Sequence, residues 1–242
     1  KFVRDAVRAF PEVYFSHRVV VGECDSGEIV LPRFLQARGA PVDESAVTIA
    51  PLGGRHVNHF WRLLSALQIP YLTLLDLDVA RYTAGWGRIK YVNDQLIVHE
   101  PENKLPEDHV IPIWNNDTYK VRNYPHYFNL LEERGVFFSY PMDLDFAMLL
   151  AYPEAYKVPE EESDASTLKA VLGKSHYDSS QYCENELKLF STYHQLFKLG
   201  SKPASHIGAL ARLSDEGVLD KMPRSLSRLA DAVIAKLMEL PE

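Results

Sequence analysis

Three short apolar runs lie in the first third of the chain, and segments with helical spacing separate them. The runs are residues 19–21, 47–50 and 71–75. Between them, residues 26–38 and 57–67 place apolar side chains three or four positions apart, which is the period of an amphipathic helix. Strands that are apolar on both faces and alternate with helices are typical of a parallel sheet covered on both sides. We therefore expect an α/β fold.

The alternation is interrupted by an insertion at about residues 79–130, which contains several prolines. Within it, residues 85–98 look helical, and a second helix is expected at 126–134. Residues 136–138 then resume the pattern as a fourth strand, and a helix begins at Phe146.

Two further segments are expected beyond the sheet. Residues 153–182 are rich in Glu, Ser and Pro, so they are interpreted as a loop or insertion. Residues 183–242 have helical spacing, with breaks at 200–203 and 222–223. We accordingly divide the chain into a sheet domain at 1–152, a connecting segment and a C-terminal helical segment.

Composition narrows the classes of function. The chain carries 26 Lys and Arg against 33 Asp and Glu, a net charge of −7, so it cannot bind nucleic acid by bulk charge. Nucleic-acid binding would need a local basic face, or metal ions in an acidic site. No apolar run approaches the roughly 18 residues of a membrane span. Cys24 and Cys183 stand alone, as expected in a reducing, cytoplasmic compartment.

The N-terminal residues indicate that the sequence is a piece of a longer protein. The chain starts at Lys1 rather than Met, and no apolar signal-peptide core follows. Residues 1–10 have the spacing of an amphipathic helix that Pro11 would end.

Carboxylates follow three of the four expected strands. They are Glu23, Asp25, Asp76, Asp78, Asp143 and Asp145. Ligands of open parallel sheets gather at the carboxyl ends of the strands, so we expect these side chains to converge. Like charges this close repel one another unless cations lie between them, and oxygen ligands suit Mg²⁺ or Mn²⁺. Two such ions would support phosphoryl chemistry.

Simpler interpretations exist for these and other polar residues. A single Asp after a strand usually caps a helix or forms a turn. His56 and His59 are spaced to bind a metal from one helix, but a surface or core role is the more frequent one for such a pair. No G-x-S-x-G motif supports a hydrolase triad.

A series of motifs runs along the chain in a fixed order. They are VVVGECDSGEIVLP at 19–32, PLGG at 51–54, LLDLD at 74–78, GWGRIK at 85–90, DLD at 143–145 and GSKP at 200–203. Together they resemble the Toprim domain of the overcoming-lysogenization-defect (OLD) family of ATP-dependent endonucleases. The resemblance covers about residues 11–212, and it rests on the order of the motifs because each motif alone is weak.

The resemblance implies a Toprim-like parallel sheet and Mg²⁺- or Mn²⁺-dependent hydrolysis of DNA, with two ions in the full site. Glu23 would act as general base or metal ligand, and Lys202 would stabilise charge on the scissile phosphate. The metal ligands implied by position are Glu23, Asp76, Asp78, Asp143 and Asp145, with Asp25 as an alternative ligand.

The resemblance also implies partners. DNA would be the substrate. The sequence itself offers candidates for a basic face that would contact DNA, with scattered solvated charge as the alternative; they are Arg81, Arg88, Lys90, Arg122, Arg134, Lys198, Lys202 and Arg212. In the family an ABC-type ATPase region precedes the Toprim domain. ATP would act only through that region, because no G-x-x-x-x-G-K-[ST] loop is present here. Such nucleases often dimerise, so a homodimer is one candidate assembly, although the sequence does not define the oligomeric state. No membrane partner is expected.

Two departures from the family pattern leave a second interpretation open. Cys24 replaces the glycine after the first glutamate, and Gly27 replaces a second glutamate. A catalytically weakened Toprim-like module for docking or dimerisation is the alternative. A third interpretation is a small-molecule phosphohydrolase, which would hydrolyse phosphomonoesters and ignore DNA.

Overall fold

The computed structural model describes residues 11–51, 57–99, 105–106, 110–113, 120–159, 163–173 and 178–237. The helix expected at residues 1–10 and the side chain of His56 lie outside these residues.

Four parallel strands form one sheet in the order β2-β1-β3-β4. They are β1 (Arg18–Gly22), β2 (Val47–Pro51), β3 (Tyr71–Asp76) and β4 (Val136–Ser139). Each coincides with a predicted apolar run, and the expected α/β fold is confirmed. From β1 the chain first adds β2 on one side and then crosses to add β3 on the other. A topological switch point therefore lies between β1 and β3, which is where ligands of such sheets bind.

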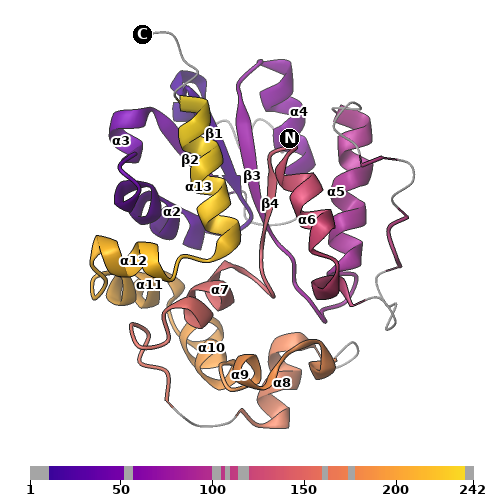
Figure 1. Cartoon of the computed structure of the whole chain (residues 1–242), viewed down its shortest axis with the longest axis vertical. Coiled ribbons are helices and arrows are strands. Elements are labelled where there is room, and N and C mark those ends of the chain that lie inside the picture. The colour runs from indigo at the N-terminus through magenta and orange to yellow at the C-terminus, as the bar shows by residue number, and fades with distance from the viewer. Residues whose placement is uncertain are drawn as a thin grey trace.

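The helices that flank the sheet are α2 (Ser26–Ala37), α3 (Val42–Ser45), α4 (Val57–Ala66), α5 (Trp86–His99), α6 (Pro125–Glu132) and α13 (Arg224–Leu237). Figure 1 shows α13, in yellow, lying across one face of the sheet beside α2. On this face Val20 of β1 lies with Leu31 of α2 and Leu229 of α13 around a small apolar gap. Alternation along a strand turns Thr73 to the opposite face, where its hydroxyl accepts a 2.8 Å hydrogen bond from Trp61 of α4.

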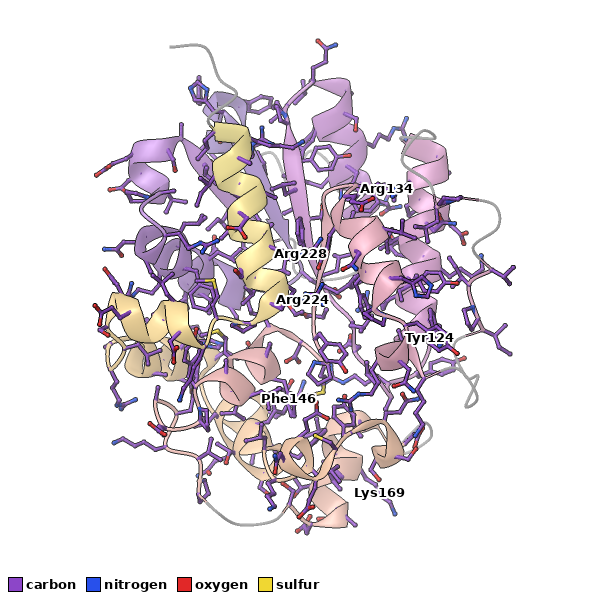
Figure 2. The ribbon with its side chains drawn as sticks, in the orientation of Figure 1. Tyr124, Arg134, Phe146, Lys169, Arg224 and Arg228 are labelled. Carbon is purple, nitrogen blue, oxygen red and sulfur yellow. The ribbon has the colours of Figure 1, made fainter. Side chains whose placement is uncertain are left out.

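The remaining helices gather at the end of the sheet where β4 leads into α7 (Figure 1). They are α7 (Leu144–Ala151), α8 (Ala165–Leu172), α9 (Glu184–Leu187), α10 (Phe190–Tyr193), the π-helical η5 (His194–Leu199), α11 (Lys202–Leu210) and α12 (Asp215–Asp220). Short 3-10 turns are η1 (Pro11–Phe15), η3 (Val121–Asn123) and η4 (Ser179–Gln181). Figure 2 shows Phe146 where α7 meets these helices, and its ring packs on Phe190 and Tyr193 with centroids 5.1 and 5.7 Å apart.

The interpretation of residues 153–182 as a loop is wrong in part, because α8 lies within them. Asp164 caps this helix by accepting a hydrogen bond from the N–H of Thr167, and Leu168, Val171 and Leu172 are buried. The sequence before α8 is polar, and the apolar stripe formed by Leu168, Val171 and Leu172 is too short to stand out beside it. The division into segments at 152 and 182 stays a prediction.

Candidate functional site: an acidic cluster at the carboxyl ends of the strands

The carboxyl ends of β1, β3 and β4 bring five of the predicted acidic residues together. Gly22 pairs with Leu74 and Asp76 pairs with Ser139, so the residues after each strand emerge at one edge. The backbone N–H of Asp76 donates to Oε2 of Glu23 at 3.1 Å. The backbone N–H of Leu144 donates to Oδ1 of Asp76 at 3.2 Å. Asp76 thus joins the segments that follow β1 and β4.

The surroundings of Asp76 disfavour its ionised form. Its pKa is raised well above the usual range of aspartate, first by burial and then by repulsion from Asp143 and Glu23, with smaller contributions from Asp78 and Asp145. Among the described residues, no cationic side chain pairs with it. A half-buried carboxylate among like charges favours either a proton or an added cation.

Two arginines predicted to contact DNA turn into the cluster. The Nη2 atom of Arg88 lies 2.7 Å from Oε1 of Glu23 and 3.0 Å from Oδ2 of Asp78. The Nη1 atom of Arg81 lies 2.5 Å from Oδ1 of Asp78 and 3.8 Å from Oδ2 of Asp143. Both guanidinium groups therefore neutralise part of the acidic charge.

Asp143 has a structural role at the start of α7. Its Oδ1 accepts the N–H of Phe146 at 2.9 Å, so it is the N-cap of that helix. Its Oδ2 accepts the hydroxyl of Tyr193 at 2.5 Å. Burial and the neighbouring Asp145 raise the pKa of Asp143. The usual capping role of an Asp after a strand therefore holds here, within the acidic cluster.

Asp145 is fully buried and has three polar partners from distant parts of the chain. The Oγ of Ser26 donates to it at 2.5 Å, Nζ of Lys202 lies 2.6 Å away, and Nε2 of His206 lies 2.9 Å away. Burial opposes ionisation, but the hydrogen bond from His206 and the ion pair with Lys202 lower the pKa of Asp145 to about 2. His206 also bonds to the hydroxyl of Tyr156 at 2.6 Å. Asp145 is therefore held as a carboxylate.

The structure places the other predicted residues away from the cluster. Asp25 is exposed just before α2, in the N-cap position. Lys90 pairs with Asp94 at 2.8 Å on the exposed side of α5. Arg122 makes a two-pronged ion pair with Glu186, with distances of 2.9 and 3.0 Å.

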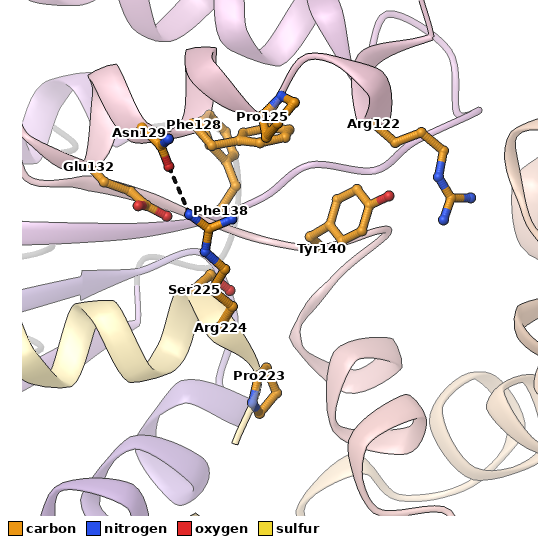
Figure 3. Close-up of a pocket in the computed structure, with 10 residues that line it drawn as sticks. All are labelled: Arg122, Pro125, Phe128, Asn129, Glu132, Phe138, Tyr140, Pro223, Arg224 and Ser225. Carbon is orange, nitrogen blue, oxygen red and sulfur yellow. Dashed lines mark hydrogen bonds between the residues drawn. The ribbon is translucent and has the colours of Figure 1, made fainter. Parts of the chain in front are cut away.

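Arg122 also lines a cavity of about 330 Å³ between α6, the end of β4 and the start of α13 (Figure 3). Phe128, Phe138 and Tyr140 supply aromatic walls, and the figure shows Arg224 reaching toward Asn129. Arg122 is the one residue of the predicted site that lines this cavity.

The donor chemistry of the cluster fits a hard divalent cation in part. Carboxylate oxygens are the ligands that Mg²⁺ and Mn²⁺ prefer. Within the part of the chain that the structure describes, however, no group of three or more His, Cys, Asp or Glu side chains is arranged to hold a metal. Arg81, Arg88 and Lys202 instead form ion pairs with oxygens of Asp78, Glu23 and Asp145.

Part of the chain that forms this site is similar in sequence to a known protein family. Residues 14–78 match the family described as "Overcoming lysogenization defect protein-like, TOPRIM domain". This stretch is similar to an OLD-like TOPRIM domain. It contains Glu23, Asp76 and Asp78, whereas Asp143, Asp145 and Lys202 join the TOPRIM residues through the contacts described above. No curated protein matches the sequence.

Solved structures of OLD proteins share the fold over nearly the whole chain. One is the C-terminal region of the OLD protein of Xanthomonas campestris pv. campestris, with 19% identity and a TM-score of 0.56, covering 94% of this chain and 99% of that chain. Another is the C-terminal region of the Burkholderia pseudomallei OLD protein, with 16% identity and a TM-score of 0.56, covering 92% and 99%. The similarity in fold therefore extends beyond the TOPRIM stretch.

The TOPRIM assignment supports an enzyme that acts on nucleic acid, and TOPRIM domains generally bind divalent metal ions. None of the helices in the described ranges has the length and apolar character required to cross a bilayer.

Sequence reasoning missed three partners of the cluster, namely Ser26, Tyr193 and His206. Tyr193 and His206 lie on C-terminal helices, far from the acidic motifs in sequence. A single Tyr or His on an amphipathic helix gives no signal that it faces a carboxylate.

Proposed function

We propose that this chain is the nuclease region of a longer OLD-family ATPase-nuclease and hydrolyses DNA phosphodiester bonds with Mg²⁺ or Mn²⁺. The observation that carries the proposal is Asp76, a carboxylate without a cationic partner among the described residues, held between other acidic groups beside the switch point of a TOPRIM sheet. Such a group favours a cation at the position where ligands of this fold bind.

The metal, when bound, supplies positive charge to the phosphate and a more acidic water. Asp76 would hold it together with Asp143 or Asp145, two of the four carboxylates that repel Asp76. Lys202 is about one third exposed while its ammonium touches Asp145, so it faces both the cluster and solvent. From there it would meet a phosphate whose charge grows in the transition state.

We select Lys198 and Lys202 from the expected basic face as the cations that contact DNA. Arg81 and Arg88 are engaged with carboxylates, whereas Lys198 is exposed and its Nζ lies 5.6 Å from the ring centroid of Tyr193. We assign backbone phosphate contacts to Lys198 and Lys202, because phosphate contacts position DNA without reading its sequence.

The decisive experiment is cleavage of supercoiled plasmid by the 242-residue chain in Mn²⁺ and in EDTA. Cleavage should require the metal and should be lost in Asp76→Ala, since the variant removes both a ligand and its charge. The matched control is Asp94→Ala, an exposed residue of α5 that pairs only with Lys90 among the described residues. Cleavage by Asp76→Ala at the parent rate, with contaminating nuclease excluded, would overturn the proposal.

A second candidate is a TOPRIM-like docking module, and the arginines favour it. Arg81 and Arg88 neutralise part of the cluster without a metal. A docking module should bind Mn²⁺ no better than a surface carboxylate and should leave plasmid intact. It should still associate with the ATPase region of the longer chain or with a second copy of itself. For either candidate we place the protein in the cytoplasm and assign any effect of ATP to the ATPase region.

A further inference from the structure

Arg88 is delivered to the cluster by the turn that follows the Asp76–Asp78 motif. Gly85 adopts a left-handed conformation (φ of 59°), and its N–H donates to the carbonyl of Leu77 at 2.8 Å. The chain therefore turns back on the motif before α5 begins at Trp86. Arg88 lies in the first turn of that helix, and its side chain is only 8% exposed. This turn fixes the guanidinium beside Asp78.

The oxygens of Glu23 and Asp78 all have partners. The guanidinium of Arg88 donates to Oε1 of Glu23 and to Oδ2 of Asp78. The backbone N–H of Asp76 donates to Oε2 of Glu23. The guanidinium of Arg81 forms an ion pair with Oδ1 of Asp78. Asp76 differs, because only its Oδ1 has a hydrogen-bond donor among the described residues.

We propose that Arg88 is a built-in counter-cation that joins Glu23 to Asp78 and limits the acidic cluster to one divalent ion, held on the side of Asp76. A guanidinium binds carboxylates through a rigid fork and remains charged at any pH the protein meets. A divalent ion could reach both Glu23 and Asp78 only after this buried group had left, and its departure would leave a charge without its partners. The inference rests on the proposed metal site and differs from the two-ion expectation.

The test is the stoichiometry and affinity of Mn²⁺, measured on the 242-residue chain by electron paramagnetic resonance of the free ion. The parent should bind one ion. Arg88→Met removes the charge and keeps an unbranched side chain. This variant should bind a second ion, or should bind the first at least about tenfold more tightly. A change of that size lies within the range of effects that neighbouring groups have on metal affinity. Arg88→Lys should stay at one ion. The control is Lys90→Met, because Lys90 lies two positions further along α5 and pairs with Asp94 at the surface.

A second variant keeps the inference testable if Arg88→Met does not fold. Under the proposal Glu23 is occupied by Arg88, so Glu23→Gln should bind Mn²⁺ within about threefold of the parent, well short of the roughly 10–100-fold loss caused by disturbing a metal site. A larger loss would make Glu23 a metal ligand and overturn the inference. Unchanged stoichiometry and affinity in a folded Arg88→Met would overturn it as well.

These outcomes are distinct from those of the nuclease proposal. A parent protein that neither binds Mn²⁺ nor cleaves DNA ends the proposed function. A parent protein that binds one Mn²⁺ ion without cleaving DNA would end the nuclease proposal and leave the inference about Arg88 intact. Absence of Mn²⁺ binding in both proteins would overturn both proposals.

Discussion

The ammonium of Lys202 lies 2.6 Å from the carboxylate of Asp145, at the start of α11. Ser201 caps this helix and Pro203 occupies its first turn, so the local sequence fixes where the helix begins. The turn thereby carries a lysine from the C-terminal helices to a carboxylate that follows β4. A solvated surface lysine would lack this contact.

Replacing Lys202 by Ala should lower DNA cleavage by about 100–1,000-fold, the usual cost of removing one charge-stabilising group in a transition state. DNA affinity should change little, because one phosphate contact is a small part of the footprint. Cleavage rate and DNA binding should be measured side by side at one salt concentration. A rate within about threefold of the parent would leave Lys202 without a catalytic role.

His206→Ala should destabilise the protein by about 1–3 kcal/mol through the loss of hydrogen bonds to buried groups. His206 is fully buried and connects Tyr156 to Asp145. The free energy of unfolding in urea measures the effect. The neighbouring Ile207 is 59% exposed, so Ile207→Ala should stay within about 0.5 kcal/mol of the parent. Equal stability of the two variants would contradict the buried contacts of His206.

Arg122→Lys should cost about 1–3 kcal/mol of stability, because lysine cannot form the two-pronged pair with Glu186. DNA binding should be unaffected, in contrast to the DNA-contact role expected from the sequence. Urea unfolding and DNA titration test the two statements separately. Arg62→Lys, an exposed position on α4, serves as the control. A weaker DNA complex with unchanged stability would restore Arg122 to the DNA-binding face.

The two cysteines should differ sharply in reactivity. Burial, together with the carboxylates of Asp76 and Asp145, raises the pKa of Cys24 well above its usual value. Cys183 is exposed. The thiolate is the reactive form of cysteine. A thiol reagent at pH 8 should therefore modify Cys183 quickly in the native protein and Cys24 only after unfolding. Cys183→Ser should remove the fast phase, and a fast phase that persists in this variant would place Cys24 in solvent.

The sheet was predictable because its strands are short apolar runs with clear periodicity on either side. The convergence of Glu23, Asp76 and Asp78 followed from their positions after the strands, since parallel strands share one carboxyl edge. These features depend on local sequence and on topology alone.

The partners of the carboxylates could not be predicted in the same way. Arg81 and Arg88 were assigned to a DNA-binding face because sequence does not show whether a cation points into a cluster or away from it. Tyr193 and His206 reach the cluster through the packing of helices remote in sequence. Pairings of this kind depend on tertiary structure, which a periodic pattern does not encode.

The position of α13 has a consequence for how the protein forms during synthesis. Val20 of β1 packs beneath Leu226 and Leu229 of α13, so one face of the sheet is completed by residues made some two hundred positions later. A nascent chain that has emerged only as far as β4 exposes apolar strand residues until residues 224–237 have been translated and docked. At about 5–20 residues per second, that interval lasts about 5–20 seconds, and the apolar face of the unfinished sheet can take part in aggregation until it ends.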